Sequence, residues 1–374
     1  MTNRQGKLKT GFTTGTAAAA ATKGALKCLL EKHCPEQVTV QLLNGQTIRI
    51  AIHSCEKADD QSAVCTVIKD AGDDPDVTNG AEIGARVSLL ANPTALRVAG
   101  SVIIKGGQGV GRVTKPGLEV PPGEPAINSG PRRMITQVTR EILKKHTIDA
   151  PTQVEVFVPA GEELARKTLN ARLGILGGIS ILGTTGVVTP MSHAAYTATI
   201  QSALSVARAC GQERVVLTTG RRSERFAQYL WPSLPEEAFV QIGDFFKFSL
   251  QTAADMMFKK LSLVVFFGKA VKMSQGIPHT HAAKSSMSLS TLSQWVRETC
   301  GQIDLAVAVE SANTARQAFD IVRLGCPGVI ERVGQEVIVA ARNFCGMKVQ
   351  VQSIILDFEG RVVFDSDAAR GMLI

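Results

Sequence analysis

Residues 11–16 read Gly-Phe-Thr-Thr-Gly-Thr and run directly into five alanines at 17–21. The stretch decides how the fold begins, because a Thr/Gly turn leads into a helix of small residues. Thr13 or Thr16 can cap that helix by accepting a backbone N–H with its hydroxyl oxygen, and Gly15 allows a tight turn. Such a turn either leaves N–H groups open to a carboxylate or phosphate or simply caps a core helix. The residues alone leave both interpretations open.

The alanine-rich helix belongs to a folded domain, although basic residues precede it as they precede a secretory signal. A signal needs an unbroken apolar stretch of roughly 7–15 residues, and Lys23 interrupts this one. Lys23 and Lys27 lie four residues apart and share a helix face. No run elsewhere approaches the roughly 18 apolar residues of a membrane-spanning helix. We therefore expect a soluble, cytoplasmic protein with no membrane partner.

Length and composition indicate a two-domain globular protein with an anionic partner. A chain of 374 residues is too long for one comfortable core, and 44% hydrophobic with 20% charged residues is typical of globular proteins. The net charge of +8 favours anions. Aromatic residues make up only 5%, which argues against a stacking surface for single-stranded nucleic acid. Nucleic acid, a membrane or an acidic small molecule would each fit this charge, but the basic residues are spread along the chain and not run together, so we expect no nucleic acid.

The eight cysteines give no signal of a disulfide framework or a zinc site. They stand at positions 28, 34, 55, 65, 210, 300, 326 and 345, and none forms a Cys-x-x-Cys pair. We interpret them as mostly buried thiols in a reducing cytoplasm.

The first half of the chain has alternating strands between two helices. Strands at 38–42 and 47–50 flank Asn44-Gly45, a strong hairpin signal, and further strands are expected at 64–69, 85–90 and 154–158. The acidic loop 70–76 lacks the spacing of a calcium loop, so we interpret it as a solvated turn.

Glycine-rich segments follow these strands. The glycines of 106–111 resemble a nucleotide loop, but a proline-rich loop follows them instead of a helix. Pro131 fits the first turn of a helix that runs to about Lys145. Arg132 and Arg133 add positive charge to the end of that helix that is already positive, which favours an anionic partner or a pairing with Glu124. Glycines within the apolar stretch 173–188 predict a bulge or a close approach of backbones.

The second half alternates helices with short buried strands, which predicts a parallel sheet. Helices are expected at 193–210, 223–230 and 248–260, strands at 214–220, 238–243 and 263–267, and a C-terminal hairpin at 349–364. Ligands of such sheets bind beyond the carboxyl ends of the strands. The residues at those ends are Thr219, Gly220, Gly243, Asp244 and Gly268. Asp244 suits either a ligand site or a helix N-cap.

Four motifs occur in order over nearly the whole chain. They are GFTTGTAAAAATKGAL, GRVTKPGLEVPPGEPAIN with PRRMI, GISILGTTG followed by Pro190-Met191-Ser192, and FFGKAVKMSQG with His281. Together they resemble the CbiD family of cobalt-precorrin-5B C1-methyltransferases in anaerobic cobalamin biosynthesis. The chain departs from the family pattern at Ser129-Gly130, Arg221-Arg222 and His279-Thr280-His281.

The resemblance implies both a fold and a reaction. It implies an α+β domain at 1–190, related by permutation to the GHMP-kinase type of fold, and a smaller α/β domain at 191–374 with a four-stranded parallel sheet. It implies transfer of a methyl group from S-adenosylmethionine to C1 of cobalt-precorrin-5B, which gives cobalt-precorrin-6A. Cobalt then enters only as part of the substrate, and we expect no protein metal site.

The residues and the resemblance together assign two binding regions. The macrocycle carries carboxylates, which suit arginine forks and a Thr/Gly turn at a helix N-terminus. We expect the corrinoid to contact Thr13, Thr14, Gly15, Lys115, Arg132 and Arg133. The methyl donor is expected in the second domain, at the five strand-end residues named above.

No catalytic residue is assigned, because displacement at a sulfonium mainly needs two reactants held in line. His193, His279 and His281 are therefore given no role in catalysis. Two other functions compete with methyl transfer. One is a GHMP-like kinase that uses 106–111 as its phosphate loop, and the other is a non-enzymatic corrinoid-binding protein of the same pathway.

Overall fold

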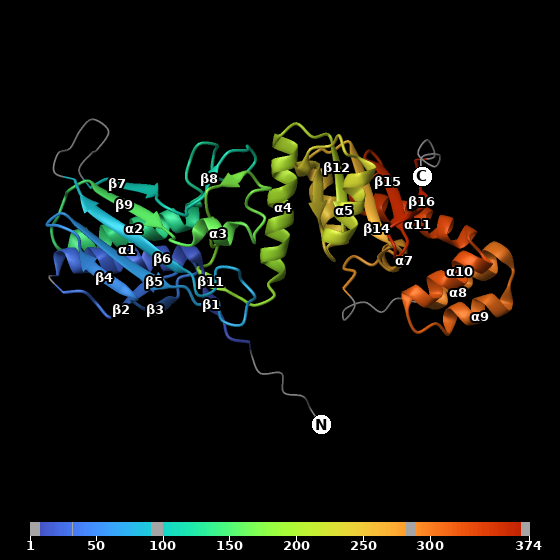
Figure 1. The fold of residues 1–374 in the computed structure, drawn as a ribbon, viewed down its shortest axis with the longest axis horizontal. Helices are drawn as coiled ribbons and strands as arrows, with labels where there is room; N and C mark the ends of the chain where they lie inside the picture. Colours follow the sequence, from blue (N-terminus) through green and yellow to red (C-terminus); the bar gives the residue numbers. More distant parts are fainter. Residues whose placement is uncertain (1–7, 32, 91–99, 282–288, 368–374) are drawn as a thin grey trace, which may run out of the picture. The chain divides into compact units, whose positions relative to one another are not determined.

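The computed structural model describes residues 8–31, 33–90, 100–281 and 289–367. The chain divides into two compact units, Met1–Ser192 and His193–Ile374, here called the first and second units. Each is a separate α/β structure (Figure 1). Among the described helices, none combines the length and the apolar character needed to cross a membrane.

The first unit is built on a five-stranded sheet with the order β4-β5-β6-β9-β7. Strands β7 and β9 are parallel, and the other neighbours are antiparallel. A separate hairpin joins β2 to β3 as the Asn-Gly signal predicts. The strands are β1 Gly11–Phe12, β2 Gln37–Gln41, β3 Thr47–Ala51, β4 Ser54–Lys57, β5 Ser62–Ile68, β6 Glu82–Leu89, β7 Val102–Gly106, β8 Arg112–Val113, β9 Thr152–Phe157, β10 Ile175–Leu176 and β11 Val187–Val188, and the helices are α1 Thr14–Leu30, α2 Ser129–Lys145 and α3 Gly161–Ala165.

Helix α1 forms the centre of the first unit. Thr13 is its N-cap, and the Thr13 hydroxyl accepts a hydrogen bond from the Thr16 N–H at 3.2 Å, as the sequence predicts. Alanines 17–21 are fully buried, because the helix packs against β5 and β6 on one side and α2 on another (Figure 1). The small side chains allow these elements to approach the helix axis closely.

The glycine-rich segment 174–188 crosses the N-terminal end of α1. The backbone of Gly183 has φ +145°, and a Cβ there would lie 2.7 Å from the Cβ of Thr13. The Gly109 carbonyl accepts from the Ile179 N–H at 3.0 Å, so the 106–111 loop packs against the same segment. No helix begins at that loop, which leads into β8. The predicted close approach of backbones is confirmed, and the loop is not a phosphate loop of the kinase type.

The second unit contains a five-stranded sheet with the order β13-β12-β14-β15-β16. Four strands are mutually parallel, and β16 pairs antiparallel with β15. The expected four-stranded parallel sheet is thus a mixed sheet of five strands, because the C-terminal hairpin joins it. The strands are β12 Arg214–Thr218, β13 Phe239–Gln241, β14 Lys260–Phe266, β15 Gln350–Leu356 and β16 Val362–Asp365, and the helices are α4 His193–Ala209, α5 Arg221–Leu230, the 3-10 helix Glu236–Ala238, α6 Phe246–Asp255, α7 Phe267–Ser274, α8 Leu289–Cys300, α9 Ile303–Glu310, α10 Ala315–Gly325 and α11 Gly328–Cys345.

Helices cover both faces of the second sheet. Along β12, Val215 and Leu217 join the core formed with α4, α6, α7 and α11. Val216 instead joins the smaller core formed with α5 and Trp231. Alternate residues therefore face opposite helical layers, which explains the continuous apolar character of these strands.

The cysteines differ from the expectation. Cys28 pairs with Cys34, and Cys300 pairs with Cys326, as disulfides. The interpretation as buried thiols is wrong for these four residues, whose pairing depends on helix ends that spacing in the sequence does not reveal.

Gly183 provides a test of how tightly the 174–188 segment is held on α1. Gly183→Ala adds a methyl group into Thr13 and forces an L-residue into an unfavourable φ, so we expect unfolding stability to fall by about 3 kcal/mol. Gly177→Ala is the matched control, because Gly177 also has a positive φ but open space around it; it should cost roughly 1–2 kcal/mol. Urea unfolding of both variants measures the difference, and equal losses would contradict the crowding argument.

Candidate functional sites

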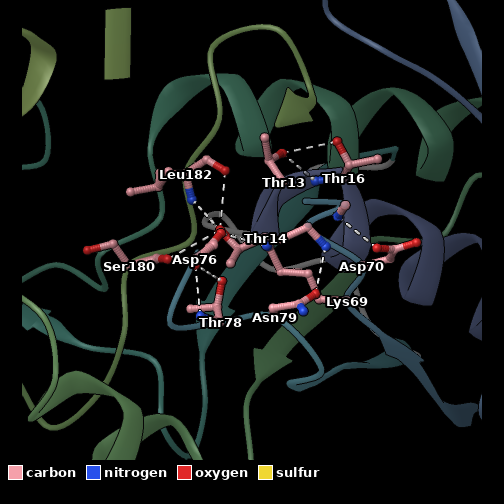
Figure 2. Close-up of polar contacts among 12 residues, drawn as sticks. Thr13, Thr14, Thr16, Lys69, Asp70, Asp76, Thr78, Asn79, Ser180 and Leu182 are labelled. Carbon is pink, nitrogen blue, oxygen red and sulfur yellow. Dashed lines mark hydrogen bonds and ion pairs between the residues drawn. The ribbon is translucent and has the colours of Figure 1, made fainter. Parts of the chain in front are cut away.

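Three distant segments meet at the N-terminal end of α1, here called the N-terminal junction (residues 10–16, 69–80 and 180–191; Figure 2). The Phe12 N–H donates to the Asp70 carbonyl at 2.9 Å, and β1 pairs with β11. The Met191 N–H donates to the Asp74 carboxylate at 3.0 Å. Each segment is therefore fixed by the other two.

The Thr/Gly turn is fully engaged inside this junction. The Gly15 N–H donates to the Leu182 carbonyl at 3.1 Å, and the Ala17 N–H donates to the Thr13 carbonyl at 3.0 Å. The Thr14 hydroxyl accepts from the Leu182 N–H at 2.9 Å, and Thr14 is buried. The expectation that this turn leaves N–H groups open to a carboxylate is wrong for Gly15, Thr16 and Ala17, because the 180–188 segment and the Thr13 cap already use them.

A buried ion pair, which the sequence analysis missed, supports the junction. The Lys69 ammonium, with 1% of its side chain exposed, lies 2.7 Å from the Asp76 carboxylate. Burial alone raises the pKa of Asp76, but the Lys69 ammonium and the hydroxyl of Thr78 outweigh it and hold that pKa below its usual value. The prediction of a solvated turn is wrong for Asp76. The sequence does contain a signal for this pair, because Lys69 directly precedes the acidic loop 70–76.

A basic groove of about 640 Å³ follows the exposed side of α2. Arg133, Arg140 and Lys144 are exposed along it and recur at near-helical spacing. Their positive charges lie along the same groove, which suits a ligand with several carboxylates. The groove residues are Ser129, Arg132, Arg133, Thr136, Gln137, Arg140, Glu141 and Lys144.

Arg132 and Arg133 have different roles in this groove. Arg132 donates through Nε to the Ile127 carbonyl at 2.8 Å and lies 3.9 Å from Glu124, so it also fixes the start of α2. Arg133 has no hydrogen bond or ion pair within the described part of the chain. The Glu119 carboxylate accepts the Ser129 N–H at 2.7 Å and supplies the negative charge that a helix N-terminus favours.

Lys115 stands apart from the groove. Its side chain is half-buried beside Gly174, and its ammonium donates to the Arg172 carbonyl at 3.4 Å. The structure therefore brings Arg132 and Arg133 together, places Thr13–Gly15 in the junction, and ties Lys115 to the loop that precedes β10.

In the second unit the predicted residues lie at the carboxyl ends of three neighbouring strands, here called the strand-end site. Thr219 and Gly220 follow β12, Gly243 and Asp244 follow β13, and Gly268 follows β14. The chain leaves β12 for α5 on one face and crosses to β14 by α6 on the other. The order 2-1-3-4-5 of strands β12–β16 makes the edge between β12 and β14 the topological switch point, where ligands of such sheets bind.

The turn after β12 is open. A side chain on Gly220 would meet no atom within 4 Å, and Gly220 is the N-cap of α5. The Thr218 hydroxyl below it is fully buried and has no hydrogen-bond partner in the described structure. A buried hydroxyl without a partner is uncommon in folded proteins, so this turn has an unused polar group as well as free space.

Asp244 is held by two neighbours instead of capping a helix, since the N-cap of α6 is Phe245. Its Oδ1 accepts from the Lys269 ammonium and, at 3.0 Å, from the Thr280 hydroxyl. Burial raises the pKa of Asp244, but Lys269 and Thr280 hold it below its usual value. Both contacts use Oδ1, so Oδ2 is left as an acceptor among the described residues. Thr280 is a further residue that the site prediction missed.

An aromatic cluster lies beside Asp244. The rings of His193 and His279 stack at 5.1 Å, and Phe245 meets His279 edge to face at 4.7 Å. Tyr196 stacks on Phe245 at 5.0 Å, and its hydroxyl lies where a side chain on Gly243 would stand. Burial, followed by the charge of Asp244, raises the pKa of Tyr196. The second unit thus combines an ionised carboxylate with flat aromatic rings, which suits a nucleoside.

The buried ion pair leads to a pH-dependent prediction. Asp76→Asn leaves Lys69 charged and unpaired, which should lower unfolding stability near neutral pH by roughly 3–5 kcal/mol. The lowered pKa of Asp76 stabilises the protein above about pH 4, the unfolded value, and this contribution disappears as the pH falls through the folded value. The difference between wild type and variant should therefore shrink on acidification. Denaturant unfolding at several pH values measures this difference in stability. Exposed Asp60→Asn is the control and should change the stability little. A difference between wild type and Asp76→Asn that stays constant with pH would contradict the pairing.

Comparisons with known proteins cover both units. The CbiD family model matches residues 1–190, and a second model, described as the CbiD C-terminal domain, matches residues 279–367. The crystal structure of a cobalamin biosynthesis protein (cbiD) from Archaeoglobus fulgidus is 28% identical, covering 73% of this chain and 82% of that one with a TM-score of 0.40.

Several relatives are much more similar in sequence. A protein of Geobacillus kaustophilus, named cobalt-precorrin-5B C(1)-methyltransferase, is 42% identical over 95% of this chain and 93% of its own length. Proteins with the same name from Nitratidesulfovibrio vulgaris and Priestia megaterium are 43% and 45% identical, over 94% and 84% of this chain and 91% and 84% of their own lengths. On this evidence the chain belongs to the CbiD family.

Proposed function

We propose that this protein is a C-methyltransferase of cobalamin biosynthesis that methylates cobalt-precorrin-5B at C1 and gives cobalt-precorrin-6A. The observation that carries the proposal is the 42% identity, over 95% of the chain, to a relative named for that activity. We further propose that S-adenosylmethionine is the donor, that cobalt enters only within the substrate, and that the enzyme works in the cytoplasm. The permuted GHMP-kinase relationship of the first unit also stays a proposal.

The donor is assigned to the strand-end site of the second unit. Three features support the assignment: the switch point between β12 and β14, the open turn at Gly220, and the carboxylate of Asp244 at the end of the next strand. An acidic group in this position commonly accepts ribose hydroxyls. In the proposal Oδ2 of Asp244 accepts such a hydroxyl, while Lys269 and Thr280 hold Oδ1. Thr219, Gly243 and Gly268 shape the edge around it.

The corrinoid is assigned to the first unit, with the basic groove of α2 as its main contact. Arg133, Arg140 and Lys144 offer exposed cations along one surface, and arginine binds carboxylates through two parallel hydrogen bonds. Arg132 adds charge while it anchors the helix. Thr13, Thr14, Gly15 and Lys115 act indirectly in this proposal, because they hold the loops that border the corrinoid surface.

The reaction is a displacement at carbon. The donor supplies a methyl group on a sulfonium, the bond from sulfur to that methyl breaks, and a bond from the methyl to ring carbon C1 forms. The residues of this chain bind the two reactants, orient them and exclude water, which accounts for much of the acceleration in such reactions. No general base is assigned to His193, His279 or His281.

Binding measurements distinguish methyl transfer from the kinase alternative. Calorimetry should detect S-adenosylhomocysteine binding and no ATP binding, and incubation with cobalt-precorrin-5B and a methyl-labelled donor should label the corrinoid. Gly220→Leu fills the open turn and should weaken the binding of S-adenosylhomocysteine at least tenfold. Gly220→Ala adds only one carbon, so this variant should bind S-adenosylhomocysteine with nearly the wild-type affinity. Both variants should keep the wild-type melting temperature. If Gly220→Leu binds S-adenosylhomocysteine normally, the donor site lies elsewhere in the protein. Binding of ATP would favour the kinase alternative.

The two arginines at the start of α2 should separate substrate binding from stability. Arg133→Gln should weaken the binding of a corrinoid with free peripheral carboxylates by roughly 10–100-fold, since a hydrogen bond to a charged group contributes about 1.5–3 kcal/mol. Its melting temperature should not change, and the loss should shrink at high salt. Arg132→Gln should weaken binding and also lower stability by about 1 kcal/mol, because the bond to Ile127 is lost. Exposed Arg166→Gln is the control, and an unaltered affinity in Arg133→Gln would reject the groove as the binding surface.

A further inference from the structure

Three cysteines converge at the C-terminal end of α1, at the opposite end of that helix from the N-terminal junction. The sulfurs of Cys28, Cys34 and Cys55 all lie within 4.8 Å of one another. Cys28 belongs to α1, Cys34 follows the helix, and Cys55 lies on β4. At 1.5 Å per residue, Cys28 is roughly 21 Å along the helix from Thr14. The cluster is therefore separate from the N-terminal junction.

We propose that, with its thiols reduced, the Cys28–Cys34–Cys55 cluster binds a thiophilic divalent metal ion of the zinc class. Tetrahedral zinc holds sulfur ligands at about 2.3 Å, which places the sulfurs of one site roughly 3.8 Å apart. Sulfurs within 4.8 Å of one another reach that arrangement with small side-chain movements. Three thiolates from one site also match the ligand preference of zinc over magnesium or calcium.

The surroundings provide an entry path and a supporting shell. Cys34 is exposed, whereas Cys28 is buried, so an ion can reach the cluster from solvent, and a water can occupy the fourth position. The neighbouring Cys65 pairs with Cys55 across β4 and β5, and the Cys55 thiol donates to the Gly24 carbonyl at 3.5 Å. Such outer contacts orient metal ligands and increase affinity.

The site has a structural consequence. Strand β4 is the edge strand of the first sheet, and edge strands are the least well held part of a sheet. A metal ion shared by Cys55, Cys28 and Cys34 ties this edge to the end of α1. The Cys28–Cys34 disulfide seen in the structure uses two of the same sulfurs, so the disulfide and the metal exclude each other.

Cobalt(II) titration of the reduced, metal-free enzyme, without corrinoid, tests the proposal. One equivalent should produce a thiolate-to-cobalt charge-transfer band and the visible bands of tetrahedral cobalt, and zinc should displace both. Cys34→Ser and Cys55→Ser should lose the charge-transfer band or much of its intensity. Cys210→Ser changes a cysteine of the second unit that belongs to neither disulfide; it is the control and should titrate like wild type.

Two further measurements separate a metal site from reactive surface thiols. Cys65→Ala keeps all three ligands, so it should retain one equivalent of cobalt with an affinity 10–100-fold weaker. Zinc should raise the melting temperature of reduced wild type but not of Cys34→Ser, whose exposed position makes the substitution harmless to folding. A reduced wild type without the band, or a band that Cys55→Ser leaves unchanged, would overturn the proposal. Donor and corrinoid binding are not used in these tests, so failure here leaves the proposed function intact.

Discussion

The first unit depends on the contact between the N-terminal end of α1 and the glycine-rich segment that crosses it. The Thr14 hydroxyl accepts from the Leu182 N–H, the Gly15 N–H donates to the Leu182 carbonyl, and Gly183 lies against Thr13. Backbones come this close only where side chains are absent. The contact also aligns β1 with β11, so the 69–80 loop has a fixed surface on which to pack. The alanines of α1 extend the same close packing along the helix.

Two of the ion pairs, one in each unit, differ in how far their ammonium groups are exposed. The Lys69 side chain is 1% exposed and the Asp76 side chain 25%, and their pair supports the loops of the N-terminal junction. The Asp244 side chain is 23% exposed and the Lys269 side chain 32%, at the strand-end site of the second unit. A fully buried ammonium such as that of Lys69 is costly to desolvate, whereas the partly exposed ammonium of Lys269 keeps its charge at lower cost.

Local patterns predicted much of this structure, and contacts between distant residues account for most of what was missed. The Thr13 cap, the Asn44-Gly45 hairpin and the residues at the strand ends all follow from neighbours a few positions apart. The Lys145–Glu31 pair spans 114 residues of sequence, and the hydrogen bond that Arg214 donates to Gln352 spans 138 residues. No local pattern in the sequence predicts either contact. Lys69 and Asp76 are only seven apart, but their burial depends on segments at both ends of the unit. For Arg132, the sequence indicated charge but could not reveal the bond to Ile127.

The carboxylates held by these contacts also bear on the chemistry. Neighbouring cations and hydroxyls lower the pKa of Asp76 and Asp244, and Lys145 lowers that of Glu31 to about 2. A carboxylate with a low pKa is a weak general base, because proton transfer follows the basicity of the acceptor. These groups are therefore better suited to holding charge in place than to removing a proton. Methyl transfer from a sulfonium requires alignment more than proton transfer, so a fixed charge such as that of Asp244 suits the reaction that we propose.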